Sequence, residues 1–342
     1  MSKKQTNGLI IAAAIFVVVG IISVVTNALS SKMTDKSKSG ASGFNAMLEK
    51  VYGTSNEALL DMPVAQDFIA VVPIEGTIQA SSGSSYGTSD GYNHDLLMDY
   101  VNLLIENEWN KGIILRLDTP GGTVYEADEL YLKLMEYKEK TGRPIWAYME
   151  SSCCSGGVYI ASSADEQYAN RITTTGSIGV IISTYDMSGL YKKLGIKEVN
   201  IVSAQNKDMG SSGKSMTDEQ KAIYQSIVDE YYAQFVDIVA DGRNMSVEEV
   251  KKLADGRIYT ATQALENGLI DGIKTEEDFE AYVKEQSGVD YFYEPASETN
   301  YWAELFGSVA STKEKSESEV LVDLMNQLGS GVPMYYAEPI GE

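Results

Sequence analysis

Short apolar segments alternate with amphipathic segments between residues 68 and 182, and this alternation limits the possible folds more than any other feature. The runs at 68–74 and 112–117 are short and of the buried-strand type, whereas 94–107 and 124–140 carry apolar residues at helical spacing. Parallel strands need a crossover connection, and strands that alternate with helices supply it. The sequence therefore predicts an α/β fold with a mainly parallel sheet and flanking helices.

Other segments of the chain fit the same architecture. Further strands are predicted at 144–149, 168–169 and 177–182. Ser155 opens a short helix, and a long helix covers 217–239. Another helix starts at Ser246, with Glu249 three residues on as its capping-box partner.

An uncharged segment near the start of the chain predicts a membrane anchor. Residues 8–25 hold no charge and no proline, and as a helix they would extend about 27 Å, enough to cross the hydrocarbon core. Lys3 and Lys4 precede them, which favours a cytoplasmic N-terminus and an extracytoplasmic body. The alternative is a cleaved secretory signal, with a poor cleavage site at 26–30. We expect an uncleaved anchor, because cleaved signals usually have a shorter apolar core.

These features divide the chain into five parts. We expect a cytoplasmic start at 1–7, a single transmembrane helix at 8–26 and a stalk at 27–66. A globular domain follows at 67–275, and an acidic extension occupies 276–342. The globular domain is expected on the extracytoplasmic side of the cytoplasmic membrane.

The charge of the chain excludes some classes of partner. The net charge is −22, and the last residues, from 275 onward, carry 15 acids against 3 lysines. Such a charge argues against binding nucleic acid, or anionic lipid through the main body. The sequence has no clustered His/Cys spacing of the kind that binds zinc, so no metal or cofactor is expected.

A serine followed by two glycines, at 155–157, is the leading candidate nucleophile. It would lie at a helix N-terminus, where the dipole favours developing negative charge, although capping the helix is the commoner role of such a serine. The only histidine is His94, in Ser/Gly-rich surroundings, so a Ser-His-Asp triad is disfavoured. Lysine is the other base that serine nucleophiles use. Cys154 is a weaker candidate, because no neighbouring histidine would generate a thiolate.

Lys207, 52 residues beyond Ser155, is the candidate base. A lysine acts as a base only if burial or a nearby cation lowers its pKa. Ser177 could orient a neutral lysine amine by a hydrogen bond. The proline and two glycines at 120–122 could direct backbone N–H groups outward as an oxyanion hole requires, or could form an ordinary turn. Spacing alone leaves competing lysines: Lys192, Lys193, Lys197 and Lys214.

Taken in order, these segments resemble the signal peptide peptidase A family, in its short form with one catalytic domain. The matching segments are 72–78, 118–122, 155–157, 175–180, 207–208, 254–259, Ala264 and 268–271. The resemblance covers residues 68–275. Two departures are visible: Cys153 and Cys154 replace the small residues usual before the serine, and 211–214 replaces a more common Ser-Pro run.

The resemblance implies a crotonase-like fold, similar to the Clp protease subunit, and makes 67–275 a peptidase domain. It implies that Ser155 is the nucleophile, that Lys207 is the general base and that Ser177 orients this lysine. It further implies that the amide of Gly121 or Gly122 holds the oxyanion. We expect a small apolar substrate pocket formed by Cys153, Cys154, Gly156, Gly157 and Val158.

The resemblance also implies partners and substrates. It points to a ring-like homo-oligomer of about eight subunits and to the degradation of signal-peptide remnants and other hydrophobic peptides. Two other functions stay open: a crotonase-like acyl-thioester enzyme, and a non-catalytic membrane scaffold or regulator. The predicted anchor argues against the first, because acyl-CoA is cytosolic. The apolar run at 332–337 resembles a substrate; it could add a strand in the enzyme's own groove or dock between subunits.

Overall fold

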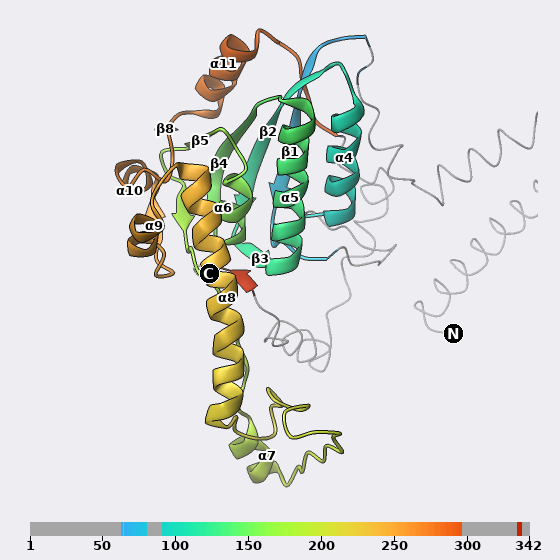
Figure 1. Cartoon of the computed structure of the whole chain (residues 1–342), viewed down its shortest axis with the longest axis vertical. Helices are drawn as coiled ribbons and strands as arrows, with labels where there is room; N and C mark the ends of the chain where they lie inside the picture. Colours follow the sequence, from blue (N-terminus) through green and yellow to red (C-terminus); the bar gives the residue numbers. More distant parts are fainter. Residues whose placement is uncertain (1–62, 64, 81–90, 296–333, 337–342) are drawn as a thin grey trace, which may run out of the picture. The chain divides into compact units, whose positions relative to one another are not determined.

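Three long parallel strands form the centre of the main sheet in the computed structural model (Figure 1). The structure describes residues 63, 65–80 and 91–295, and the backbone of 334–336. The central strands are β1 (Phe68–Glu75), β2 (Asn110–Thr119) and β4 (Ile145–Cys154), with β2 in the middle. α4 (His94–Glu106) connects β1 to β2, and α5 (Val124–Thr141) connects β2 to β4. The predicted mainly parallel α/β fold is therefore confirmed.

Both faces of this sheet are covered, which explains why residues 68–74 of β1 form an apolar run rather than alternating with polar residues. Phe68, Ala70 and Val72 point into the core shared with α4 and α5, whereas Ile69 and Val71 point into a second cluster beneath α11 (Glu276–Ser287). Figure 1 shows α4 and α5 side by side across one face of the sheet.

The end of β4 has a different neighbour from its beginning. Its first half pairs with β5 (Glu166–Ala169), and its last residues, 152–154, pair with β6 (Thr174–Gly176). β6 in turn pairs antiparallel with β7 (Ile258–Thr260), and β5 pairs with β8 (Gly272–Ile273). β9 (Phe292–Tyr293) extends the sheet beside β1, so residues beyond 275 contribute to it.

Helices complete the chain around the end of β4. α6 (Gly156–Ala161) follows β4 directly, and α8 (Asp218–Arg243) packs its C-terminal half against it through Phe235, Val236 and Val239. Gln220 is the one buried residue in the N-terminal half of α8. Figure 1 shows α7 (Ser188–Leu194) near the opposite end of α8 from the sheet. The remaining helices are α9 (Val247–Leu253) and α10 (Ala261–Glu266).

The helix predicted to start at Ser246 is confirmed, whereas the strand predicted at 177–182 is wrong. Ser246 caps α9 and forms the expected capping box with Glu249. The sheet strand lies earlier, at Thr174–Gly176, and no regular strand covers 177–182. The chain leaves the sheet because Ser177 adopts a positive φ of 51° and donates its backbone N–H to the carbonyl of Arg257 instead.

The membrane prediction concerns residues that the structure does not describe. The cytoplasmic start 1–7, the anchor 8–26 and nearly all of the stalk lie outside the described residues, as do 296–333 and 337–342 of the acidic extension. Within the described part of the chain, no helix is long and apolar enough to cross a bilayer.

Candidate active site

Ser155 lies at the junction of β4 and α6, in a backbone conformation that L-residues rarely adopt. Its φ is 53° and its ψ is −110°, and it is the N-cap residue of α6. Two backbone hydrogen bonds hold it there: its N–H donates to the carbonyl of Gly176, and its own carbonyl accepts from Tyr159. Strain of this kind persists only where the surroundings enforce it, and it concentrates at functional sites.

The hydroxyl of Ser155 is buried without a partner. The residue is 1% exposed, and its Oγ makes no hydrogen bond among the described residues. Although it caps α6 as a residue, its side chain makes no capping hydrogen bond, so the structure does not support the commoner capping role. Leaving a buried hydroxyl without a hydrogen bond costs about 1–3 kcal/mol of folding stability. Such a group needs an explanation, and a catalytic role for Ser155 is the candidate.

The two cysteines before Ser155 are free, buried thiols. Burial raises the pKa of the Cys153 thiol well above its usual range and also raises the pKa of Cys154. A thiol that stays protonated is a poor nucleophile, so this finding agrees with choosing Ser155 over Cys154.

The other pocket residues predicted around Ser155 are packed into the same region. Gly156, Gly157 and Val158 form the first residues of α6 and are buried. A Cβ on Gly157 would lie 2.7 Å from Cγ2 of Thr119 and 3.2 Å from the sulfur of Cys153. Gly157 is therefore required for α6 to pack closely on the end of β2.

The two candidate oxyanion glycines form a short strand, β3 (Gly121–Thr123), held at the end of β2. Ile78 donates its N–H to the carbonyl of Gly121 and accepts from the N–H of Thr123. Since peptide groups alternate in direction along a strand, those of Gly122 face the opposite edge. The N–H of Gly121 donates to Oγ1 of Thr119. Of the two candidates, Gly122 has the amide that faces away from these contacts.

β10 (Met334–Tyr336) occupies that opposite edge of β3. It runs antiparallel to β3 and aligns residue 335 with Gly122. β3 and β10 both lie against α6, whose N-cap is Ser155. A segment more than two hundred residues beyond β3 in sequence therefore adds a strand to it, next to the candidate nucleophile.

We expect Gly122→Ala to disable the site by displacing β3. A Cβ at this position would lie 1.8 Å from the carbonyl oxygen of Ile78, and because that atom belongs to the backbone, β3 itself must shift. A displacement near 1 Å at a reacting centre costs about 10²-fold in rate. Peptidase assays and thermal melts on the purified variant would measure the effect.

Gly142→Ala is the matched control for this prediction. Gly142 has a φ of 65° at the end of α5 and open space around it, so alanine there strains the backbone far from Ser155. It should lower stability by about 1–2 kcal/mol and leave activity intact. Normal activity in Gly122→Ala would contradict the assignment of β3 to the site.

Ser177 is linked to Ser155 through Gly176, the last residue of β6. Gly176 accepts the Ser155 N–H and pairs in register with Cys154, and Ser177 follows it at once. Ser177 is 9% exposed and shares the positive φ of Ser155. The structure therefore brings Ser155, Ser177 and β3 to one end of the sheet.

Lys207 is not part of this cluster within the described chain. It is exposed, and it lies in the segment between α7 and α8, beside the first turn of α8. Gln234, further along α8, contacts Tyr159 of α6. The sixteen residue steps from Asp218 to Gln234 span about 24 Å of helix. No described contact links Lys207 to Ser155.

Two other basic groups are already engaged elsewhere. His94 is the first residue of α4, as the helical spacing of 94–107 predicted; its Nδ1 is 2.7 Å from the hydroxyl of Tyr92 and its Nε2 is 3.0 Å from Glu129. Lys214 pairs with Asp208 at 2.6 Å. Neither contacts Ser155 among the described residues. The ion pair with Asp208 makes Lys214 a weaker competitor to Lys207, whose amine has no ion pair within the described chain.

Thr119 and Ile78 hold the site together, and the sequence did not single them out. Thr119 donates its hydroxyl to the carbonyl of Gly76 and accepts from Gly121, while Ile78 fixes β3. Both residues lie within segments that match the family, 118–122 and 72–78, and this was the one available signal for their importance.

Comparisons with known proteins point to a family of peptidases. Residues 137–290 match peptidase family S49. A protein of Enterococcus faecium named as a signal peptide peptidase SppA is 31% identical over 332 residues, which cover 92% of this chain and 94% of that protein. Protease 4 of Haemophilus influenzae is 33% identical over 60% of this chain and 32% of its own length. The capsid assembly protease C of phage lambda is 25% identical over 68% of this chain and 56% of its own length.

An α/β domain with a strained, buried serine at a strand-to-helix junction defines a serine-type peptidase here, since the matching family is one of peptidases. The chain belongs to the signal peptide peptidase SppA family within peptidase family S49.

Proposed function

We propose that this chain is a membrane-anchored endopeptidase that uses a Ser155–Lys207 dyad to degrade signal-peptide remnants and other hydrophobic peptides. The observation that carries the proposal is the buried, unpartnered Oγ of Ser155 beside a strand edge that accepts an extended segment. A nucleophile that lacks its base within the described chain requires a base from elsewhere.

The reaction would follow the course of other serine acyl transfers. Neutral Lys207 takes the proton of Ser155 as Oγ attacks the peptide carbonyl, and the amide of Gly122 stabilises the resulting oxyanion. The lysine ammonium then gives its proton to the leaving amine as the C–N bond breaks. Water attacks the remaining ester, again with Lys207 as base, and releases the acid and free Ser155. Ser177 orients the lysine amine by a hydrogen bond.

We infer that Lys207 reaches Ser155 from a neighbouring subunit. The separation of about 24 Å along α8 supports this arrangement, because within one chain the Lys207 amine does not contact the Ser155 hydroxyl. A head-to-tail interface that closes on itself forms a ring, in which every subunit gives one lysine and receives another.

The segment around Lys207 has the surface of an interface. α7 has no buried residue, and the region around it exposes large apolar side chains, with Val199 at 79% and Ile201 at 99%. The others are Ile181, Tyr185, Leu190, Leu194, Ile196 and Val202. So many exposed apolar side chains within one stretch of chain are typical of interaction sites, and a ring of about eight subunits would cover them.

Substrate would bind as an added strand on β3. The antiparallel pairing of β10 with β3 supports this mode, because backbone hydrogen bonds accept any extended sequence. The buried, apolar surroundings of Ser155 favour hydrophobic side chains, and a ring would exclude folded proteins. The same pairing supports the proposal that residues 332–337 occupy the enzyme's own groove.

Removing residues 332–342 should therefore make the enzyme faster. A tethered segment competes with substrate at a high effective concentration, so its loss should raise the initial rate on a short apolar peptide by about 3- to 10-fold. Initial rates at low substrate concentration, together with the oligomeric size, would measure the effect.

Truncation after residue 337 is the matched control, because it keeps β10 and shortens the chain only beyond it. This variant should behave like the full chain. An unchanged rate on removal of 332–342, or a lower rate with dissociation of the oligomer, would reject self-occupancy and favour a docking contact between subunits.

Cleavage of a synthetic hydrophobic signal peptide in detergent or vesicles tests the proposed function itself. We expect wild-type enzyme to degrade it, a stable folded protein to survive, and acyl-CoA to stay intact. Thioester hydrolysis without peptide cleavage would favour the crotonase-like alternative, and inactivity of the assembled protein on every peptide would favour a scaffold.

A further inference from the structure

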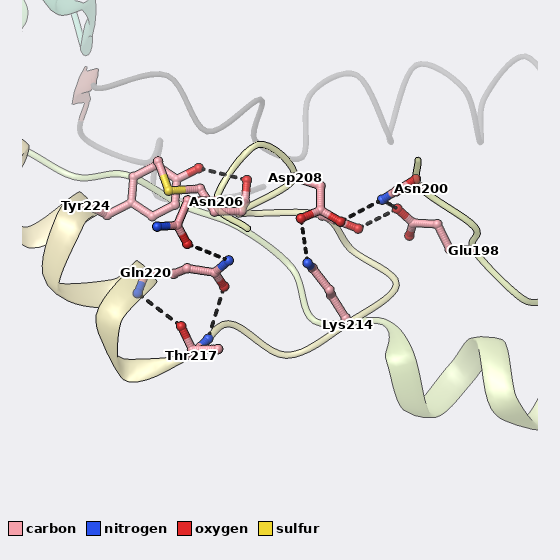
Figure 2. A network of polar contacts seen from close by, with 10 residues as sticks. Glu198, Asn200, Asn206, Asp208, Lys214, Thr217, Gln220 and Tyr224 are labelled. Carbon is pink, nitrogen blue, oxygen red and sulfur yellow. Dashed lines mark hydrogen bonds and ion pairs between the residues drawn. The ribbon is translucent and has the colours of Figure 1, made fainter. Parts of the chain in front are cut away.

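Lys207 lies between Asn206 and Asp208, whose side chains are held by the contacts drawn in Figure 2. The side chain of Lys207 itself makes no hydrogen bond or ion pair within the described chain. The backbone here is a series of tight turns: Lys207 donates to Ala204, and Met209 donates to Asn206. Figure 2 shows the network that surrounds this turn, from Glu198 on one side to Tyr224 on the other.

On the preceding side, Asn206 is bound to the first turn of α8. Its Oδ1 accepts from Nε2 of Gln220 at 3.3 Å, and its Nδ2 donates to Oε1 of Glu219 at 3.3 Å. Gln205 also donates to Glu219. The side-chain oxygen of Asn206 therefore faces the amide of Gln220, and its side-chain nitrogen faces the carboxylate of Glu219.

Gln220 links this loop to the helix. Its Oε1 accepts from the N–H of Thr217, and its N–H donates to Oγ1 of Thr217, which together form the capping box of α8. Its Nε2 is left for Asn206. Gln220 is 2% exposed, whereas its neighbours in this half of α8 are exposed or half-buried, so its amide is shielded from competing water.

On the following side, Asp208 is held by an ion pair and an amide. Lys214 contacts Oδ1 of Asp208 at 2.6 Å, and Asn200 donates to Oδ2 at 3.3 Å. The hydrogen bond from Lys214 lowers the pKa of Asp208, so this residue is a carboxylate across the neutral range. Tyr224 of α8 donates to the carbonyl of Met209, which fastens the end of the turn.

We propose that Gln220, acting through Asn206, is a positioning residue that directs the amine of Lys207 into the catalytic site of the neighbouring subunit. The inference rests on the proposed function, in which Lys207 is the base. A glutamine is required in place of the glutamate common at this capping position, because one end of the side chain must accept from the helix N-terminus while the other donates to Asn206.

Gln220→Glu separates these two roles. The introduced glutamate keeps the acceptor for Thr217 and so preserves the capping box, but it sets a carboxylate oxygen against Oδ1 of Asn206. If the Asn206 amide flips to donate to this new carboxylate, its oxygen then faces the carboxylate of Glu219. Either orientation leaves one repulsive contact, and the loop that carries Lys207 should move.

We expect Gln220→Glu to lower kcat by about 10- to 100-fold with little change in KM, since a misplacement near 1 Å at a reacting group has effects of this size. Because a lysine base must be neutral to act, kcat should rise with pH in the alkaline range, and Gln220→Glu should shift this rise because the environment of the base changes. Asn206→Ala removes the loop side of the same contact without touching α8 and should reproduce the loss of kcat.

A charge exchange supplies the decisive control. The double variant combines Glu219→Gln with Gln220→Glu, so the amide and the carboxylate trade places in the first turn of α8. A flipped Asn206 can then donate to the introduced glutamate and accept from the introduced glutamine, so kcat should recover to within about 3-fold of wild type. Thr217→Ala weakens the cap and leaves the Asn206 contact, so it should lower the melting temperature without a matching loss of kcat.

The outcomes distinguish this inference from the proposed function. If Lys207→Ala is inactive while Gln220→Glu and Asn206→Ala keep wild-type kcat, the positioning role is rejected and the dyad stands. If Lys207→Ala keeps activity, the dyad itself fails. A third outcome is that kcat falls in proportion to the melting temperature in all variants and does not recover in the double variant. That result would show that Gln220 has only a structural role, and it would reject the proposal.

Discussion

Ser155→Ala is expected to abolish peptide cleavage, with a loss of about 10⁴- to 10⁶-fold, because a nucleophile and its base act as a unit. The protein should fold normally. The substitution removes a buried hydroxyl that has no partner among the described residues, so the melting temperature should stay the same or rise. Assays on a hydrophobic peptide and thermal melts on the same preparation measure both quantities.

Ser152→Ala is the matched control for this change. Ser152 lies on the same strand, β4, but its hydroxyl donates to the carbonyl of Thr119 and it is half-buried rather than fully buried. We expect it to retain most activity. If Ser152→Ala is dead and Ser155→Ala is active, the nucleophile has been misassigned.

Lys207→Ala is expected to be as damaging as Ser155→Ala, and mixing the two variants should restore activity. When the pair forms between subunits, a mixed ring contains sites in which an intact Ser155 meets an intact Lys207 from its neighbour. For random mixing of equal amounts in a head-to-tail ring, about one quarter of the sites are complete. Co-expression with two affinity tags, purification through both tags and a peptide assay would measure this fraction.

Two results would contradict that expectation in different ways. Mixed rings without activity, from variants that are each inactive, would show that Ser155 and Lys207 pair within one subunit. Activity in pure Lys207→Ala would remove Lys207 from the mechanism. Lys214→Ala is not a substitute test of the base, because Lys214 holds Asp208 and its loss would also disturb the Lys207 turn.

The parts of the fold that the sequence predicted well are those whose local pattern and tertiary environment agree. Residues 68–74 of β1 and the central residues 113–115 of β2 are apolar because both faces of the sheet are covered there, and this burial is visible in the residues themselves. α9 was predicted from Ser246 and Glu249 because a capping box is a local interaction.

The parts that the sequence missed depend on contacts from distant segments. Residues 150–154 continue β4 despite being polar or small, because β6 supplies hydrogen-bonding partners to 152–154. The apolar run after Ser177 looked like a strand, but the positive φ at Ser177 turns it away, and Ile181 ends 52% exposed. Neither a turn of this kind nor an exposed isoleucine is visible in a hydrophobic pattern.

In the candidate site, too, local sequence allowed some predictions, whereas features that depend on distant segments were missed. Ser155 could be proposed because few residue types act as nucleophiles and a single histidine left few choices of base. Its strained φ and the use of the Gly121 amide by Thr119 could not be predicted, since each depends on the folded backbone. An added strand was one expectation for 332–337, but β3 as its partner and the alignment of residue 335 with Gly122 could not be read from the sequence. Likewise, the spatial separation of Lys207 from Ser155 follows from the length of α8, and the number of residues between them in sequence does not reveal it.

Covalent labelling of Ser155 is the most direct test of a serine nucleophile activated by a lysine. The full-length protein would be treated with a serine-reactive peptide analogue, and the modified residue and the rate of its modification would be measured by mass spectrometry. We predict a single adduct on Ser155, formed faster as the pH rises through the alkaline range, and at least about 10²-fold slower in Lys207→Ala. An adduct on another residue, or the same labelling rate in Lys207→Ala, would contradict the account.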